Sequence, residues 1–235
     1  MYAIAHTAVG LAAKRAAPAA PLLGLLVAAQ GSELAWIGLS YLGAEHPTVD
    51  GRGTLHLDHL PWSHSLLTGL GGGLVLWAAL RFLARRPEIA TVLGIVFASH
   101  IVLDLIQHEP DIRVVPWLAR PALGLDVSAD PWLDLAVETA LSVACWAYFR
   151  GTWQLLTGIL VLNLSNLPLM LGQRAAAPLA SDHVVLPSVI LVQTVLAIAV
   201  TWLLARPTVR ARGSRSEPEQ PRAAGPLPAT PARSK

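Results

Sequence analysis

Long apolar stretches separated by short polar segments dominate the first 205 residues of the chain. A helix needs about 20 mostly apolar residues to cross the hydrocarbon core of a bilayer. Six stretches have about that length, at residues 21–43, 64–82, 89–107, 131–149, 152–172 and 184–205. Residues 2–13 form another apolar segment, which is too short to cross at about 1.5 Å per residue. The pattern predicts an all-α polytopic membrane helical bundle with about six spans and a short N-terminal helix.

The two ends of the chain need separate interpretation. Residues 206–235 are rich in Pro, Ala, Arg and Ser and lack apolar periodicity, so they cannot bury enough surface to become ordered. We therefore predict a transmembrane helical domain at 1–205 and a disordered basic tail at 206–235. At the other end, Lys14 and Arg15 precede an apolar stretch, as in a signal peptide. Because the apolar pattern continues to Gly43, we expect an uncleaved first span.

Composition supports a membrane protein. Hydrophobic residues make up 54% of the chain and charged residues 14%, against roughly 25% charged in an average soluble domain. This excludes most soluble enzymes and any ordinary nucleic-acid binder, because a soluble surface needs more charge. The eight tryptophans suit a chain anchored at bilayer interfaces. We expect membrane lipid as the surroundings and no nucleic-acid partner.

The basic residues predict an orientation in the membrane. If the spans alternate sides, 13 of the 17 Lys and Arg residues fall on one side, seven of them in the tail. The other side holds Arg52, Arg113, Arg120 and Arg174. The positive-inside rule then places the tail in the cytoplasm and the loops 44–63, 108–130 and 173–183 outside. We expect a multi-pass protein of the cell inner membrane.

Ionisable side chains lie within several predicted spans. An ionised side chain near the bilayer centre costs at least about 2.5–3.5 kcal/mol, so Glu33 and Asp104 need internal partners. His6, His64 and His100 are the candidate partners, and His100 and Asp104 share a helix face one turn apart. Two simpler interpretations remain open. Each histidine can be a hydrogen-bonded packing residue, and His100 with Asp104 can be a buried pair that links helices.

Other polar and small residues in the spans have simpler interpretations. Asp134 and Glu138 form a second pair four residues apart, which we interpret as hydrogen-bonding groups lining the same cavity. A run of glycines, Gly69 and Gly71–Gly73, predicts close packing of one span against a neighbour.

Three imidazoles and two carboxylates form a mixed nitrogen and oxygen set. Such a set suits Zn²⁺, Mn²⁺ or Fe²⁺ better than Ca²⁺ or Mg²⁺. We predict one divalent metal, with zinc as first candidate, in the outer half of the bundle and open to the extracytoplasmic face. The candidate metal ligands are His6, Glu33, His64, His100 and Asp104. The candidate catalytic residues are Glu33 as base and Asp58 or His59 as the acid for the leaving group.

The order of these motifs resembles a known family. His6, then Glu33, then Ser63-His64-Ser65, then the SHIVLD segment at 99–104 is similar to the pattern of membrane-bound metal-dependent hydrolases. These are also described as LexA-binding, inner-membrane-associated hydrolases, and zinc-dependent phospholipases C have a comparable ligand order. The resemblance covers about residues 1–110. It implies a metal site at His6, Glu33, His64, His100 and Asp104, and hydrolase activity.

The acidic motif departs from the family pattern. The family commonly has PD-x-D, whereas this chain has Ser32-Glu33-Leu34-Ala35 and so lacks the proline and one carboxylate. A second acidic ligand is therefore missing, which argues for one metal rather than two.

Three functions are compatible with the sequence. The first is a membrane hydrolase acting on a lipid-linked or phosphoester substrate. The second is an ion- or proton-coupled transporter using the same His, Asp and Glu cluster, although the sequence shows no inverted repeat or matched broken helices. The third is a non-catalytic membrane protein whose polar residues pair locally and hold helices together.

Overall fold

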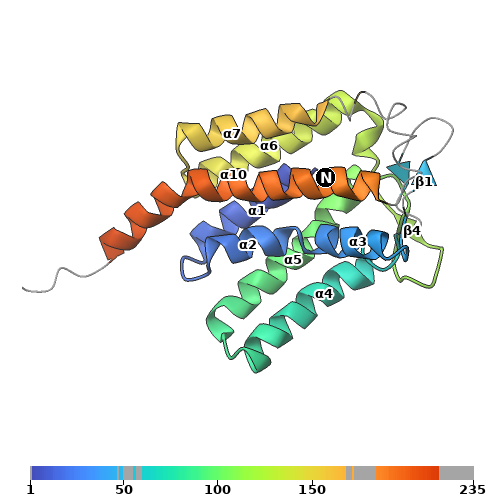
Figure 1. Cartoon of the computed structure of the whole chain (residues 1–235), viewed down its shortest axis with the longest axis horizontal. Helices are drawn as coiled ribbons and strands as arrows, with labels where there is room; N and C mark the ends of the chain where they lie inside the picture. Colours follow the sequence, from blue (N-terminus) through green and yellow to red (C-terminus); the bar gives the residue numbers. More distant parts are fainter. Residues whose placement is uncertain are drawn as a thin grey trace, which may run out of the picture.

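The computed structural model describes residues 2–46, 48–49, 55–56, 60–167, 171 and 184–216. These residues are mostly helical (Figure 1). The elements are α1 (Ala3–Ala16), α2 (Leu22–Ala29), α3 (Gly31–Tyr41), α4 (Leu66–Ala78), the π-helical turn η1 (Ala79–Leu83), α5 (Pro87–Gln107), the 3₁₀ turn η2 (Val127–Ala129), α6 (Pro131–Phe149), α7 (Trp153–Ser165) and α10 (Val185–Ser216). Two short antiparallel pairs complete them, β1 (Thr48–Val49) with β2 (Leu55–His56) and β3 (Ile112–Arg113) with β4 (Ala122–Leu123).

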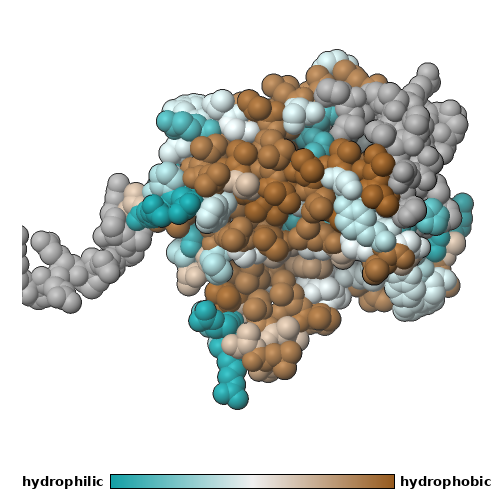
Figure 2. All heavy atoms as spheres, viewed as in Figure 1, coloured by the Kyte–Doolittle hydropathy of each residue, from teal (hydrophilic) through white to brown (hydrophobic). Residues whose placement is uncertain are grey.

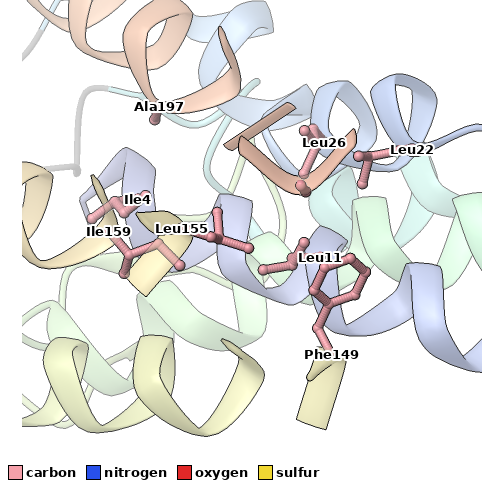
Figure 3. Close-up of a cluster of buried hydrophobic side chains, with 9 residues drawn as sticks. Ile4, Leu11, Leu22, Leu26, Phe149, Leu155, Ile159 and Ala197 are labelled. Carbon is pink, nitrogen blue, oxygen red and sulfur yellow. The ribbon is translucent and has the colours of Figure 1, made fainter. Parts of the chain in front are cut away.

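Helix α1 lies at the centre of the bundle. It contacts α2, α5, α6, α7 and α10, and most of its first nine residues are buried. Figure 3 shows its side chains Ile4 and Leu11 within an apolar cluster shared with α2, α6, α7 and α10. The segment was predicted to be short, and the structure adds that it lies in the interior of the bundle. His6 is therefore carried into the core.

The predicted first span, 21–43, is broken. Helices α2 and α3 meet at Gln30 with a bend of 57°. The break brings Gly31 against α5, where a Cβ atom on that residue would lie 2.1 Å from the ring of Phe97. Glycine is therefore required for this approach, and the bend sets the direction of the first turn of α3, which carries Glu33.

In the part of the chain that the structure describes, three helical segments are long and apolar enough to cross a membrane: Leu66–Leu83, Pro87–Gln107 and Val185–Ala211. The bent pair α2 and α3 makes four if it is counted as one span. The prediction of six spans is therefore not supported within the described residues. Helix α7 has 13 residues, and α6 carries two acidic residues and does not reach the same apolarity.

The glycines of α4 allow a close approach to α5. A Cβ atom at Gly73 would lie 2.5 Å from the carbonyl oxygen of Gly94, and one at Gly69 would lie 2.5 Å from Ile101. A Cβ at Gly72 would lie 2.4 Å from the ring of Phe97, so close packing is confirmed at these three positions, whereas a Cβ at Gly71 would meet nothing within 4 Å. The approach holds α5, which carries His100 and Asp104, against the start of α4.

The surface is apolar along the helices and basic at one end. Figure 2 shows hydrophobic side chains over the middle of the molecule, as expected for a face covered by lipid. The last turn of α1, η1 with the turn after it, and the turn after α6 lie at the left in Figure 1. They carry Lys14, Arg15, Arg81, Arg85, Arg86 and Arg150. We call this the basic end. The strands and the loop that follows α5 lie at the opposite end.

Helix α10 runs past the predicted domain boundary. It continues through Arg206 and Pro207 to Ser216, so the first part of the predicted disordered tail is helical. The remainder, 217–235, lies outside the described residues.

Candidate metal centre

The structure brings the five predicted ligands together from four parts of the chain. His6 comes from α1, Glu33 from the first turn of α3, His64 from the segment before α4, and His100 and Asp104 from α5. Among the described residues, two groups could each hold a metal ion, His6 with His100 and Asp104, and Glu33 with His64 and His100. Within each group the ligand atoms lie within 4.8 Å of one another, and His100 belongs to both groups.

The two carboxylates face the imidazole Nε2 atoms. Asp104 Oδ2 lies 3.3 Å from His100 Nε2 and 3.8 Å from His64 Nε2, while its Oδ1 lies 3.3 Å from His6 Nε2. Glu33 Oε2 lies 3.5 Å from His64 Nε2 and 3.6 Å from His100 Nε2. Polar atoms of the five residues thus lie close together, as expected for a shared site.

These separations match the spacing of ligands around a small cation. Two ligands bound at about 2.1 Å in tetrahedral geometry lie about 3.4 Å apart. An N–H···O hydrogen bond typically spans about 2.7–3.2 Å, which is shorter than each of the five contacts. The contacts lie at or beyond the long end of hydrogen bonding, and their geometry also suits a shared central ion.

The tautomer of His100 leaves its Nε2 available to a metal. His100 Nδ1 lies 2.9 Å from the carbonyl oxygen of Ala29, the last residue of α2. A carbonyl can only accept, so Nδ1 carries the proton and donates it. In the neutral ring Nε2 then has a lone pair directed at Glu33 and Asp104. Such outer hydrogen bonds commonly orient metal-binding histidines.

The burial of the Glu33 and Asp104 carboxylates favours a positive charge close to them. The side chains of His6, His64, His100 and Asp104 are 5% exposed or less, and Glu33 is 17% exposed. Buried carboxylates are stable only when paired with a cation or well hydrogen-bonded. A metal ion at their centre would neutralise both carboxylates, and Glu33 is the most exposed of the five residues. The cluster could therefore bind a metal ion.

Gln30, at the break between α2 and α3, fastens the helix that carries His6. Its Nε2 donates to the carbonyl oxygen of Ala3 at 2.5 Å and to Thr7 Oγ1 at 2.8 Å. Both partners flank His6 on α1. Sequence reasoning missed this residue, although an amide inside an apolar stretch is a recognisable signal.

His64 is held by a second group of residues that the sequence did not reveal. Its Nδ1 lies 2.8 Å from Ser63 Oγ, and that hydroxyl lies 2.6 Å from Glu45 Oε2. Ser65 next caps α4, accepting a hydrogen bond from the backbone N–H of Thr68. His64 is thus fixed between this hydroxyl–carboxylate pair and the start of a helix.

The remaining predicted residues lie outside the cluster or outside the described residues. Asp58 and His59, the candidate leaving-group acids, fall outside the described residues. Asp134 accepts a hydrogen bond from Gln107 Nε2 at 3.0 Å, and Glu138 accepts one from the backbone N–H of Tyr2 at 2.6 Å. These two acids therefore act as hydrogen-bond acceptors, in line with their predicted role.

His108 directly follows α5, at the same end as the centre. Desolvation lowers the pKa of its imidazole to about 3. The ring is therefore neutral at pH 7 and adds no positive charge there.

Comparison of the chain with protein-family models, with curated proteins and with solved structures finds no match. The resemblance to membrane-bound metal-dependent hydrolases therefore stays a prediction, and the functional argument rests on the geometry of the cluster.

Proposed function

We propose that the chain is a membrane hydrolase with one divalent metal ion, zinc in the first instance, that acts on a lipid-linked or phosphoester substrate. One observation carries the proposal: His64, His100, Glu33 and Asp104 converge at ligand–ligand spacing inside a bundle with an apolar surface. Zinc suits a set of imidazoles and carboxylates, with manganese and iron as the next candidates.

The residues divide into ligands and a base. His64, His100 and Asp104 hold the ion, and His6 supports Asp104 from the far side. A bound divalent ion supplies Lewis acidity, which polarises a phosphoryl or carbonyl oxygen and makes a coordinated water easier to deprotonate. Glu33, the most exposed of the five, accepts the proton of the attacking water. The water oxygen bonds to the ester centre, the bond to the alcohol oxygen breaks, and the proton passes to that leaving oxygen.

The position of the centre supports a lipid-linked substrate. Asp104 lies three residues before the end of α5, at the end of the bundle away from the basic end. Exposed tryptophans occur in this half of the structure, among them Trp62, Trp117 and Trp132. Tryptophan is enriched at bilayer interfaces, so an ester at headgroup level would be within reach of the centre. With the basic end cytoplasmic, that interface is the extracytoplasmic one.

A hydrolysis assay on the full chain tests this proposal. Detergent-purified protein supplied with Zn²⁺ is expected to cleave a fluorogenic phosphodiester or a phospholipid in mixed micelles. His100→Ala and Asp104→Ala should lower the rate by more than about 100-fold, because each removes a ligand rather than an outer partner. His46→Ala, in an exposed loop, is the matched control. Rates that are independent of metal, or unchanged in both ligand variants, would contradict the proposal.

The broken span favours one alternative, an ion- or proton-coupled transporter. Transporters often place ion sites where a helix is interrupted, and the break at Gln30 brings the Ala29 carbonyl to His100. Flux of protons or Zn²⁺ into reconstituted vesicles, lost in Glu33→Gln, would favour transport. We expect vesicles containing the wild-type protein to show no such flux.

A further inference from the structure

Glu45 is a fully buried acid in the segment between α3 and β1. Its Oε1 accepts hydrogen bonds from the backbone N–H groups of Trp62 at 2.6 Å and Ser63 at 3.1 Å. Its Oε2 accepts a third from Ser63 Oγ at 2.6 Å. Three hydrogen bonds give both oxygens of this buried carboxylate a donor. All three donors belong to the two residues directly before His64.

The direction of the hydrogen bonds follows from the chemistry of the groups. A serine hydroxyl carries one hydrogen, and Ser63 gives it to the Glu45 carboxylate. At its second contact, 2.8 Å from His64 Nδ1, the hydroxyl must therefore accept. His64 Nδ1 carries a proton, and its Nε2 lone pair points toward Glu33 Oε2 and Asp104 Oδ2. The chain of donors runs from imidazole to hydroxyl to carboxylate.

We propose that Glu45 is a positioning residue of the metal centre, acting on His64 through Ser63. It selects the His64 tautomer that can bind a metal through Nε2, fixes the ring plane and makes the ring a stronger ligand. Metal-binding histidines commonly donate to a carboxylate or to a backbone carbonyl. Here His100 uses the carbonyl of Ala29, and His64 uses a carboxylate reached through a hydroxyl. The inference rests on the proposed metal centre.

A purely structural role for Glu45 can be separated from this one. Its bonds to the backbone of Trp62 and Ser63 would order the loop even without a metal. Ser63→Ala keeps these backbone donors and removes the hydroxyl that links Glu45 to His64. Ser63→Thr restores a hydroxyl. The two Ser63 variants therefore test the hydrogen bond between Glu45 and His64 through the Ser63 hydroxyl, while the backbone bonds that order the loop stay in place.

The experiment measures Zn²⁺ affinity of the detergent-purified full chain by competition with a chelator. Ser63→Ala and Glu45→Gln should weaken binding about 10–100-fold, the usual effect of losing an outer partner of a metal ligand. Ser63→Thr should restore the affinity. Glu88→Gln, an exposed acid that pairs with Arg86 at the basic end, should leave it unchanged. Visible spectra of the Co²⁺-loaded protein should change in Ser63→Ala and return in Ser63→Thr.

A second measurement needs no variant. Nitrogen NMR of ¹⁵N-histidine-labelled wild-type protein without metal should show His64 with its proton on Nδ1 when the ring is neutral. Wild-type affinity and an unaltered Co²⁺ spectrum in Ser63→Ala, or a His64 proton on Nε2, would overturn the positioning role alone. A wild-type protein that binds no Zn²⁺ would overturn the metal centre as well.

Discussion

The imidazole rings of His6 and His100 are stacked, with centroids 3.7 Å apart and planes 7° from parallel. The two rings come from α1 and α5 and meet opposite oxygens of Asp104. His6 Nε2 faces Oδ1 and His100 Nε2 faces Oδ2, each at 3.3 Å. Asp104 therefore contacts His6 through one carboxylate oxygen and both His64 and His100 through the other. The two histidines are not equivalent, because His100 belongs to both candidate ligand groups and His6 to one.

Substitution of these histidines should separate their roles. His100→Ala is expected to abolish stoichiometric metal binding, since it removes the ligand common to both groups. His6→Ala should retain binding with affinity lowered about 10–100-fold, as for loss of an outer partner. Zn²⁺ titration with a competing chelator measures both. Equal loss in the two variants would show that His6 is a ligand of the same rank as His100.

The close approach of α4 and α5 should be sensitive to one methyl group. Gly73→Ala would place a Cβ 2.5 Å from the Gly94 carbonyl oxygen. We expect it to lower the free energy of unfolding by about 1–3 kcal/mol. Gly71→Ala, on the same helix with nothing within 4 Å, should be neutral or stabilising by up to about 1 kcal/mol. Thermal unfolding in detergent measures the difference. Equal changes in stability for Gly73→Ala and Gly71→Ala would contradict the close packing of α4 against α5 at Gly73.

The side-chain amide of Gln30 connects the break between α2 and α3 to the part of α1 that carries His6. Gln30→Met keeps the side-chain volume but leaves the Ala3 carbonyl and Thr7 without this donor. Thr7 Oγ1 still donates to the Ala3 carbonyl at 2.6 Å, so both oxygens keep a partner. The free energy of unfolding should therefore fall by about 0.5–1.5 kcal/mol, the usual net contribution of a hydrogen bond. Zn²⁺ affinity should also fall, because His6 lies between the two contacts. A loss of stability with unchanged Zn²⁺ affinity would show that the hydrogen bonds of Gln30 do not affect the metal centre.

The orientation can be tested by labelling single cysteines. In a Cys145→Ser background, Ala44→Cys introduces a thiol on the exposed segment after α3, and Glu88→Cys introduces one next to the basic end. With the basic end in the cytoplasm, an impermeant thiol reagent added to intact cells should label the first and spare the second. The reverse pattern would place the metal centre toward the cytoplasm.

The residues that converge could be identified from the sequence because a charged residue is unusual within an apolar segment. Glu33 and Asp104 stand out against the long apolar stretches around them, and the spacing of His100 and Asp104 indicates a shared helix face. Glu45 gives no such signal. An acid in a polar loop is ordinarily solvated, and its burial depends on the backbone of Trp62 and Ser63, which are distant in sequence.

The helical character of the chain could be predicted, but the number of spans could not. Apolar content predicts helices in a membrane, whereas the break at Gln30 and the close approach of Gly31 to Phe97 involve residues distant in sequence. Length alone indicates that α1 is too short to cross the membrane but does not reveal where it lies. Its burial at the centre follows from the helices that surround it, which a count of apolar residues does not reveal.

Elemental analysis of the detergent-purified full chain tests the metal centre most directly. After incubation with Zn²⁺ and removal of free ion, the wild-type protein and His46→Ala should retain about one divalent ion per chain. His100→Ala and Asp104→Ala should retain none. The absence of metal in the wild-type protein, or unchanged metal content in both ligand variants, would contradict the account.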